Sequence, residues 1–187
     1  MSNIWFTSDL HFCHNKDFVW GARFFNNIDE MNEAIVERFN SKVKPEDTLY
    51  ILGDVMLNDN EKAETYLSRL NGKKIFICGN HDTKSRIEIY KKYTDVDIKY
   101  ADVIKYKKRI IYLSHYPTIT KDDKDLRNMI INFYGHTHQT ENFYKDYVNM
   151  YHVGVDSHNC YPVNIDEALT EITNKILEQK ENVAYEK

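Results

Sequence analysis

The sequence predicts an α/β fold, built either on one mixed β-sheet or on two stacked sheets. Apolar runs of strand length alternate with segments of helical periodicity through the first half of the chain. The second half contains apolar runs close enough together to pair as a hairpin. Small clusters of Asp, Asn and His follow several of the apolar runs, which is where α/β proteins place their ligand sites.

The strands expected from these runs share a β-branched or aromatic composition and end at Gly, Ser or a polar cluster. They cover residues 3–8, 48–52, 73–78, 98–106, 109–114, 129–134 and 147–155. The segments 98–106 and 109–114 form the hairpin, which turns at Lys107 and Lys108. The first-half strands are separated by helices, so the sheet there is expected to contain parallel pairs.

Four helices are expected, over residues 27–43, 60–72, 84–93 and 165–179. Met31, Ile35 and Phe39 fall on one face of the first of these, and Leu169, Ile172 and Ile176 do the same in the last. A capping box predicts where the first helix begins, with Asn27 as N-cap and Glu30 three residues later. Asn60 is the expected N-cap of the second helix, and Gly72 its stop signal.

Composition limits the class of protein. The chain has 187 residues, of which 42% are hydrophobic and 13% aromatic, so we expect one folded domain over 1–187 with a polar, frayed end at about 178–187. The formal net charge of −4 provides no global basic field for duplex nucleic acid, although it leaves room for a nucleotide bound locally.

Cysteine usage and hydropathy indicate the compartment. The three cysteines form no C-x-x-C pair, so a disulfide framework or a structural zinc site is not expected. The chain shows neither the pattern of a signal peptide nor an apolar run long enough for a membrane span. We therefore expect a cytoplasmic protein with no membrane partner.

The polar clusters predict a metal site. They read SDLH, GDV, GNHD, SHYP and GHTH, and each follows an expected strand. The ligand candidates in them are Asp9, His11, Asp54, Asn80, His115, His136 and His138. Asp9 and His11 are two residues apart, so in an extended chain their side chains point the same way. Gly53, Gly79 and Gly135 each precede a candidate and allow a sharp turn there.

The donor types indicate which metals are bound. Carboxylate, amide oxygen and imidazole without thiolate suit divalent manganese, iron, zinc or nickel. Seven candidates exceed what one ion with open positions needs, so we expect two ions, with Asp54 bridging them because a carboxylate can bind one ion with each oxygen. Two metals in this arrangement suit displacement at phosphorus.

The ordered pattern D-x-H, GD, GNHD, H, GHxH resembles the calcineurin-like metallophosphoesterase superfamily over residues 4 to about 160. The details are most similar to small single-domain phosphoesterases of bacteria and phages, through SDLHF-x-H, NGKKIFICGNHD and VGVD followed by PV. This resemblance implies two mixed sheets packed face to face with helices outside. It also implies two divalent cations, manganese foremost, and a bridging hydroxide as nucleophile.

The resemblance further implies a role for each matching residue. The first metal would be held by Asp9, His11, Asp54 and His138. The second would be held by Asp54, Asn80, His115 and His136. His81 would protonate the leaving oxygen or stabilise the transition state, and Asp82 would orient it, although both residues also suit the cap of the following helix.

Other polar residues carry weaker predictions. His14 matches the second histidine of the small-enzyme opening and is expected near the metals or the substrate phosphate. Arg23, with its forked guanidinium, and Asn15 are expected substrate-binding residues, with a solvated surface role as the alternative for each. The loop that contains Asp156, His158 and Asn159 could reach the rim of the site.

Three further residues are left open. His152 is expected to be packed or exposed and not a ligand. Cys13 is either a metal-adjacent thiol or a small buried residue, with burial favoured. Tyr116 either stacks on a base or fills the core.

The sequence therefore predicts a phosphoesterase that acts on a phosphate ester, a nucleotide or a nucleic-acid end, with a phosphodiester favoured because no insertion long enough for a cap domain is present. The alternative is a non-catalytic metal-binding or protein-interaction scaffold on the same fold. All seven ligand positions and His81 are occupied by suitable residues, which favours the enzyme. The sequence does not indicate the oligomeric state.

Overall fold

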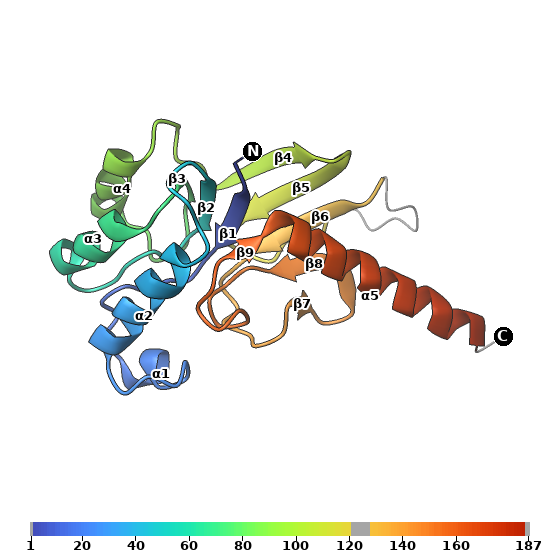
Figure 1. The fold of residues 1–187 in the computed structure, drawn as a ribbon, viewed down its shortest axis with the longest axis horizontal. Coiled ribbons are helices and arrows are strands. Elements are labelled where there is room, and N and C mark those ends of the chain that lie inside the picture. The colour runs from blue at the N-terminus through green and yellow to red at the C-terminus, as the bar shows by residue number, and fades with distance from the viewer. Residues whose placement is uncertain (1, 121–127, 186–187) are drawn as a thin grey trace.

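The computed structural model describes residues 2–120 and 128–185, and it contains two β-sheets flanked by helices (Figure 1). The strands are Ile4–Thr7 (β1), Thr48–Leu52 (β2), Lys73–Ile77 (β3), Ala101–Tyr106 (β4), Arg109–Ser114 (β5), Ile130–Tyr134 (β6), Phe143–Tyr144 (β7), Tyr147–His152 (β8) and Val163–Asn164 (β9). The helices are Asp17–Trp20 (α1), Ile28–Asn40 (α2), Asn60–Arg69 (α3), Lys84–Tyr90 (α4), the 3₁₀ turn Lys91–Tyr93 (η1) and Ile165–Tyr185 (α5).

Both sheets are mixed. In the first, with order β3-β2-β1-β9, the first three strands are parallel and β9 runs antiparallel at one edge. In the second, with order β4-β5-β6-β8-β7, the three central strands are parallel and the two edge strands are antiparallel. The prediction of two stacked mixed sheets is thus confirmed, and the alternative of a single sheet is wrong.

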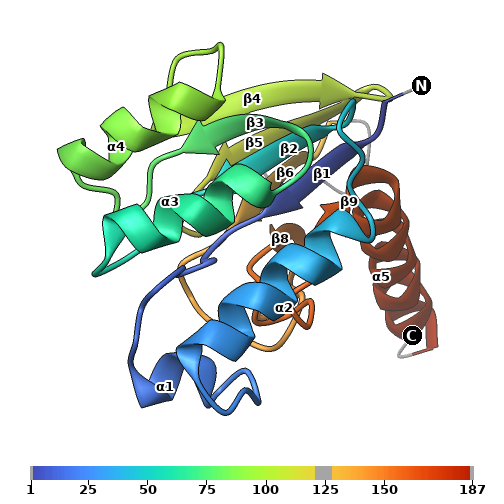
Figure 2. The same cartoon turned by 60° about the vertical axis from the view of Figure 1, so that its left-hand side comes forward.

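The first sheet is buried on both faces because alternate residues of its strands enter different cores. On β1, Trp5 packs among residues of α2 and α3, whereas Phe6 faces the second sheet and meets Phe133 of β6 edge to face at 4.9 Å. Figure 2 shows α2 and α3 lying over β1, β2 and β3. The helix face predicted for Met31, Ile35 and Phe39 is confirmed, since all three are fully buried.

Helix α5 covers part of the inter-sheet core. Its residues Ala168, Ile172 and Ile176 are buried there, with Leu169 packed at the margin. The predicted end of this helix at 179 is wrong, because α5 continues to Tyr185. The predicted fraying at about 178–187 stays a prediction, and 186–187 lie outside the described residues. No helix in the described part of the chain is both long enough and apolar enough to cross a bilayer.

The helix starts partly follow the sequence signals. Asn27 caps α2 and its side chain accepts a hydrogen bond from the Glu30 amide, as predicted. The Glu30 carboxylate, however, receives the Asn26 amide and not that of Asn27. The N-cap of α3 is Asp59 and not Asn60, and α3 ends at Arg69 before it reaches Gly72.

Short elements were not predicted. Strands β7 and β9 have two residues each and α1 has four, too few for any periodicity to show in the sequence. The hairpin turn at Lys107 and Lys108 is confirmed, with both residues in the left-handed conformation that a two-residue turn requires.

The two sheets are joined at one end of their parallel strands. Ser8, just after β1, forms a parallel bridge with Gly154, just after β8, and its carbonyl accepts the Val155 amide at 3.2 Å. This contact brings the carboxyl ends of β1 and β8 together. The loops that leave the parallel strands of both sheets therefore meet at the same edge.

Candidate metal centre

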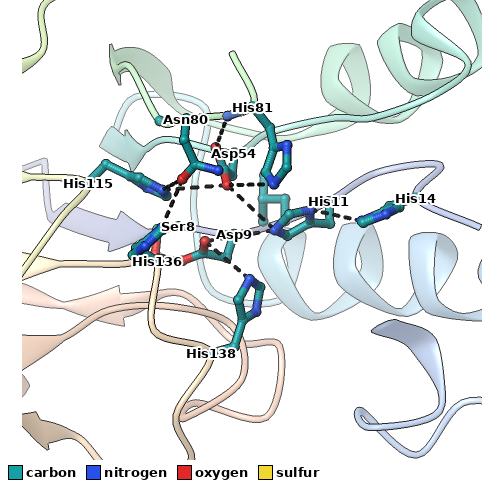
Figure 3. A network of polar contacts seen from close by, with 12 residues as sticks. Ser8, Asp9, His11, His14, Asp54, Asn80, His81, His115, His136 and His138 are labelled. Carbon is teal, nitrogen blue, oxygen red and sulfur yellow. Dashed lines mark hydrogen bonds and ion pairs between the residues drawn. The ribbon is translucent and has the colours of Figure 1, made fainter. Parts of the chain in front are cut away.

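The seven predicted ligands lie at the edge where the two sheets meet. Their side chains come from the loops after β1, β2, β3, β5 and β6, and Figure 3 shows them turned toward one another. His115 and His136 lie at one side of the group, and His11 and His14 at the other (Figure 3). Five separate chain segments thus converge on one polar cluster.

Asp9 is fully buried at the centre of this cluster. Its Oδ2 accepts hydrogen bonds from the Ser8 hydroxyl at 2.5 Å and from the His136 amide at 2.9 Å. Its Oδ1 has no hydrogen-bond partner among the described residues. A buried carboxylate oxygen without a partner is costly, so its position indicates that another positive group completes the site.

Two imidazoles face that oxygen. The distance to Asp9 Oδ1 is 3.9 Å from His11 Nε2 and 3.7 Å from His138 Nε2. His11 Nε2 is buried and also without a hydrogen-bond partner in the described chain, and it lies 3.8 Å from Asp54 Oδ2. The donor atoms of Asp9, His11 and His138 are close enough to one another to share one cation.

A second group lies on the other side of Asp54. His115 Nδ1 lies 2.8 Å from the Leu52 carbonyl and donates to it, so Nε2 is the ring nitrogen that faces the site. That Nε2 is 3.5 Å from Asp54 Oδ2 and 2.9 Å from Asn80 Oδ1. His136 Nδ1 lies 2.8 Å from the same Asn80 oxygen.

Asp54 Oδ2 is therefore between the two groups, as its predicted bridging role requires. Its other oxygen, Oδ1, accepts the His81 amide at 2.9 Å. The geometry also places Asp9 with Asp54 and His115 in a second set of mutually close donors. Asp9 thus borders both groups, whereas the sequence assigned it to the first metal only.

Burial and charge shift the pKa values of these groups. Burial raises the pKa of Asp9, and the nearby histidines only partly offset it. Burial acts the same way on Asp54, but the hydrogen bond and charge of His115 outweigh it and lower the pKa to about 2. For His115 itself burial acts downward, while Asp54 and Asp9 raise its pKa to about 9. The buried carboxylates thus favour positively charged groups at this edge of the sheets.

The backbone is strained at the same place. The residues Asp9, His11, Asp54, His136 and His138 all have positive φ, between 49° and 72°. Such conformations cost about 1–3 kcal/mol each in residues other than glycine, and they concentrate at functional sites. The extended-chain reason given for pairing Asp9 with His11 is therefore wrong, although both side chains do reach the site.

Two glycines make space for the carboxylates. A Cβ at Gly79 would lie 2.2 Å from Asp54 Oδ1, and a Cβ at Gly135 would lie 2.5 Å from Asp9 Oδ2 and 2.2 Å from the Ser8 hydroxyl. Any larger residue would displace a candidate ligand. The glycines that precede the polar clusters are thus required by close approach.

His81, the predicted catalytic residue, lies beside Asp54 and is partly open to solvent. Its side chain is 43% exposed, and its Nε2 is 3.9 Å from Asp54 Oδ2. Its ring lies 5.7 Å from that of His11, measured between centroids. It is the half-exposed imidazole of the cluster on the side away from His138 (Figure 3).

Asp82 does not act as predicted. Its Oδ2 accepts the amides of Asp54 and Gly79, at 2.9 and 2.8 Å, and its Oδ1 accepts the Tyr90 hydroxyl at 2.7 Å. Among the described residues, the Asp82 carboxylate makes no hydrogen bond to the His81 side chain. The N-cap of α4 is Thr83 and not Asp82. Asp82 therefore fixes the Asp54 loop and neither orients His81 nor caps the helix.

Arg23 also corrects the sequence interpretation. It is buried, and its Nε and Nη2 bind the Asp156 carboxylate at 2.8 and 3.1 Å. Its guanidinium also donates to the carbonyls of Asp9 and Leu10 and, at 3.6 Å, to Met31 Sδ. A guanidinium held in this way is not free for a substrate phosphate. The prediction that Arg23 binds substrate is wrong because the sequence does not show that its side chain turns inward.

The two other predicted substrate residues remain near the surface. His14 Nδ1 lies 3.2 Å from His11 Nδ1, so His14 is next to the cluster, and its ring centroid is 6.4 Å from that of His81. Asn15 is exposed and its amide N–H bonds to the Cys13 carbonyl. Its substrate role stays a prediction.

The remaining open residues are placed as follows. Cys13 is buried, burial raises its pKa to about 11, and its Sγ accepts a weak bond from Asn32, so it is the small buried residue that was favoured. His152 is buried against Ser157, and burial lowers its pKa to about 3. His158 binds the His152 carbonyl, and Asn159 binds Arg38, so neither joins the donor groups.

Two contributing residues were not predicted. Ser8, which directs Asp9, precedes the motif and looks like an ordinary strand-end serine. Asp156 was named only as a residue that could reach the rim, yet its Oδ2 lies 2.9 Å from His138 Nδ1. The VGVD segment accompanies the metal motif and so indicated that Asp156 matters, but the sequence does not show that its partner is His138.

The donor set fits divalent cations. Carboxylate, amide and imidazole atoms converge here, and Asp9 Oδ1 and His11 Nε2 are buried without a hydrogen-bond partner in the described part of the chain. This is the arrangement expected of residues that hold cations of borderline hardness.

Comparison with known proteins identifies the family of the chain. A family model for the calcineurin-like phosphoesterase superfamily domain matches residues 3–173. The chain therefore belongs to the calcineurin-like phosphoesterase superfamily, as its motifs suggested.

Individual relatives are similar over shorter stretches. An uncharacterized protein, MJ1445, of Methanocaldococcus jannaschii is 40% identical over 84 residues, which cover 44% of this chain and 48% of that one. The Gene 66 protein of Mycobacterium phage L5 is 35% identical over 85 residues, 44% of this chain and 41% of that one. The aligned part thus spans less than half the length of these curated relatives.

A solved structure shares the fold. The protein of unknown function AQ665 from Aquifex aeolicus superposes with a TM-score of 0.70 at 28% identity, covering 89% of this chain and 97% of that one. The architecture described above is therefore that of a known fold.

Proposed function

We propose that this protein hydrolyses phosphate esters with two divalent cations bound at the candidate metal centre. One observation carries the proposal: Asp54 Oδ2 lies between His11 Nε2 and His115 Nε2, at 3.8 and 3.5 Å, so one carboxylate oxygen serves both donor groups. Membership of the phosphoesterase superfamily supports the class of reaction.

The residues that would hold the cations follow from the two groups. The first cation would be held by Asp9, His11, Asp54 and His138, and the second by Asp54, Asn80, His115 and His136. Such cations supply charge neutralisation at the phosphate and lower the pKa of a water molecule. Manganese is the proposed metal, with iron, zinc and nickel as alternatives, because oxygen and imidazole donors suit all four.

His81 acts as the proton donor in this proposal. It is 43% exposed, so it can meet a bound substrate. The candidate ligand His138 is exposed to a similar degree, at 42%, but its Nδ1 is held by Asp156. Its amide is anchored on Asp54 Oδ1, which fixes the start of the side chain relative to the centre. From there the imidazole can give a proton to the departing oxygen of the ester.

Exposed aromatic side chains support a nucleotide-like phosphodiester as substrate. Tyr116 is 50% exposed, and its ring lies 4.6 Å from the His136 ring and 5.2 Å from the His115 ring, measured between centroids. Phe18 is 72% exposed and lies 5.8 Å from the His14 ring, beside the opposite group. Each offers a free aromatic face to a base or an aryl group.

The substrate preference can be tested on two diesters with the same leaving group, the p-nitrophenyl esters of thymidine 5′-monophosphate and of ethyl phosphate. Stacking on an aromatic side chain is worth about 1–3 kcal/mol per base. Tyr116→Leu should therefore raise KM for the nucleotide ester by roughly 5- to 140-fold and leave KM for the ethyl ester unchanged. Equal effects on both esters would contradict the preference.

The activity itself is tested by metal removal. Protein treated with a chelator should not hydrolyse bis(p-nitrophenyl) phosphate, and Mn²⁺ should restore turnover. Parallel assays with Fe²⁺, Zn²⁺ and Ni²⁺ identify the preferred metal. A protein that binds metal but hydrolyses none of a panel of mono-, di- and cyclic phosphate esters would instead be the non-catalytic scaffold.

A further inference from the structure

Asp156 and Arg23 form a buried pair directly behind the first donor group. The Asp156 carboxylate receives two bonds from the Arg23 fork, at 2.8 and 3.1 Å, and its Oδ2 also lies 2.9 Å from His138 Nδ1. The side chains of Arg23 and Asp156 are 3% and 11% exposed, so the pair is shielded from solvent. Both charges are therefore satisfied inside the protein.

This chain of contacts determines how His138 faces the centre. An ionised carboxylate only accepts, so the bond to Asp156 places the His138 proton on Nδ1. The Nε2 lone pair is then directed toward Asp9 Oδ1, 3.7 Å away. His138 is otherwise 42% exposed and has positive φ, so this bond is what restrains its ring.

Arg23 connects the same chain to the opposite ligand loop. Its Nη2 donates to the Asp9 carbonyl at 2.8 Å and its Nη1 to the Leu10 carbonyl at 3.2 Å. One guanidinium thus holds the backbone beside Asp9 and, through Asp156, the ring of His138. These two ligands are 129 residues apart, and the contact fixes their relative position.

We infer that Asp156, held by Arg23, is a positioning residue that sets the tautomer and orientation of His138 for binding a cation. The inference rests on the proposed function, because it assigns the first donor group to a cation. It explains why a forked side chain is buried at position 23, since a lysine could bind the carboxylate or the carbonyls but could not span both.

Manganese affinity of chelator-treated protein, measured by isothermal titration calorimetry, tests the inference. Loss of the partner of a metal-binding histidine typically lowers metal affinity 10- to 100-fold, so Asp156→Asn should weaken Mn²⁺ binding by about that factor. Asp47→Asn is the matched control: it alters another buried, hydrogen-bonded carboxylate, at the far end of the first sheet, and should leave Mn²⁺ affinity unchanged.

A second variant and a spectroscopic readout cover the case in which Asp156→Asn does not fold. Arg23→Lys keeps the charge and removes the fork, and it should lower Mn²⁺ affinity less than Asp156→Asn does. Nitrogen NMR of the metal-free wild type at pH 9 should show His138 protonated on Nδ1, and Arg23→Lys should show a mixture of tautomers.

The outcomes separate the two proposals. If the wild type binds Mn²⁺ and both site variants bind it as tightly, Asp156 has only a structural role and this inference is overturned. If Asp47→Asn weakens binding as much as Asp156→Asn, the effect is general destabilisation, which also overturns it. If the wild type binds no divalent cation, the proposed function fails first, and this inference fails with it.

Discussion

Asp9 and Asp47 are two buried carboxylates at opposite ends of the first sheet, and their surroundings differ. Asp47, just before β2, accepts the Asn3 amide at 2.7 Å and the Trp5 indole N–H and Lys44 amide, each at 3.0 Å. Asp9, just after β1, keeps one oxygen without a partner among the described residues. Both oxygens of Asp47 therefore have hydrogen-bond partners, whereas only one oxygen of Asp9 does.

The pKa values differ in the same sense. Burial raises the pKa of Asp9, and its partners do not reverse this. Burial also acts to raise the pKa of Asp47, but the bonds from Lys44, Asn3 and Trp5 outweigh it and the pKa is lowered. Asp47 is thus a carboxylate that stabilises the fold through its own hydrogen bonds, whereas the protein alone leaves Asp9 destabilised by burial.

The largest effect is expected from Asp9→Asn. Removing a ligand of a catalytic cation costs several kcal/mol of transition-state stabilisation, so turnover should fall by at least about 10³-fold. The metal-free variant should unfold at the wild-type temperature or above, because a carboxylate destabilised by burial is replaced by a neutral amide. Turnover and thermal unfolding in chelator measure the two effects. A clear loss of metal-free stability would show that Asp9 resembles Asp47 after all.

His81→Ala comes next in size. Loss of a general acid lowers the rate by about 10²–10⁴-fold, and the loss should be smaller for esters with a good leaving group such as p-nitrophenol than for alkyl esters. The variant should still bind Mn²⁺, because His81 is not among the proposed ligands. Rates on matched aryl and alkyl diesters test this role. A variant that loses Mn²⁺ binding would make His81 a ligand.

Asp47→Ala should affect stability and leave the chemistry unchanged. It leaves the Trp5 indole N–H without its buried partner and removes bonds to a charged acceptor, at a cost of about 3 kcal/mol. For a chain of this size that lowers the midpoint of thermal unfolding by roughly 6–12 °C. Turnover per folded molecule, measured well below that midpoint, should equal that of the wild type; a large fall in turnover would refute the separation of the two ends.

A pH titration gives the smallest effect. Because the folded-state pKa of Asp47 is lowered, its ionised form stabilises the fold fully above the unfolded value of about 3.9 and loses this as pH falls through the folded value. The difference in unfolding free energy between wild type and Asp47→Asn should therefore shrink below about pH 4. Urea unfolding from pH 6 to pH 3 measures it, and a difference that grows on acidification would have the wrong sign.

The sequence predicts the larger elements well because their signals are local. The strands of the two central parallel groups are apolar runs, and α2 shows both a capping residue and a buried face. The two-residue strands β7 and β9 exist only because a neighbouring strand pairs with them. No local pattern encodes such pairing, so these strands could not be predicted.

The candidate site divides in the same way. The positions of the candidate ligands follow from residue type and strand end, and the structure brings all seven side chains together. The roles of Arg23, Asp82 and Asp156 depend on tertiary contacts: Arg23 turns inward to Asp156, and Asp82 holds the backbone of Asp54. Sequence spacing does not determine which way such side chains turn.

The most direct test of the central claim is the thermal unfolding of chelator-treated protein titrated with Mn²⁺. A ligand that binds only the folded state adds about 2.7 kcal/mol of stability at a hundredfold excess over Kd. The wild type and Asp47→Asn should therefore show the same rise in unfolding temperature with Mn²⁺, and Asp9→Asn should show almost none. An equal rise in Asp9→Asn, or no rise in the wild type, would contradict the assignment of this edge as a metal centre.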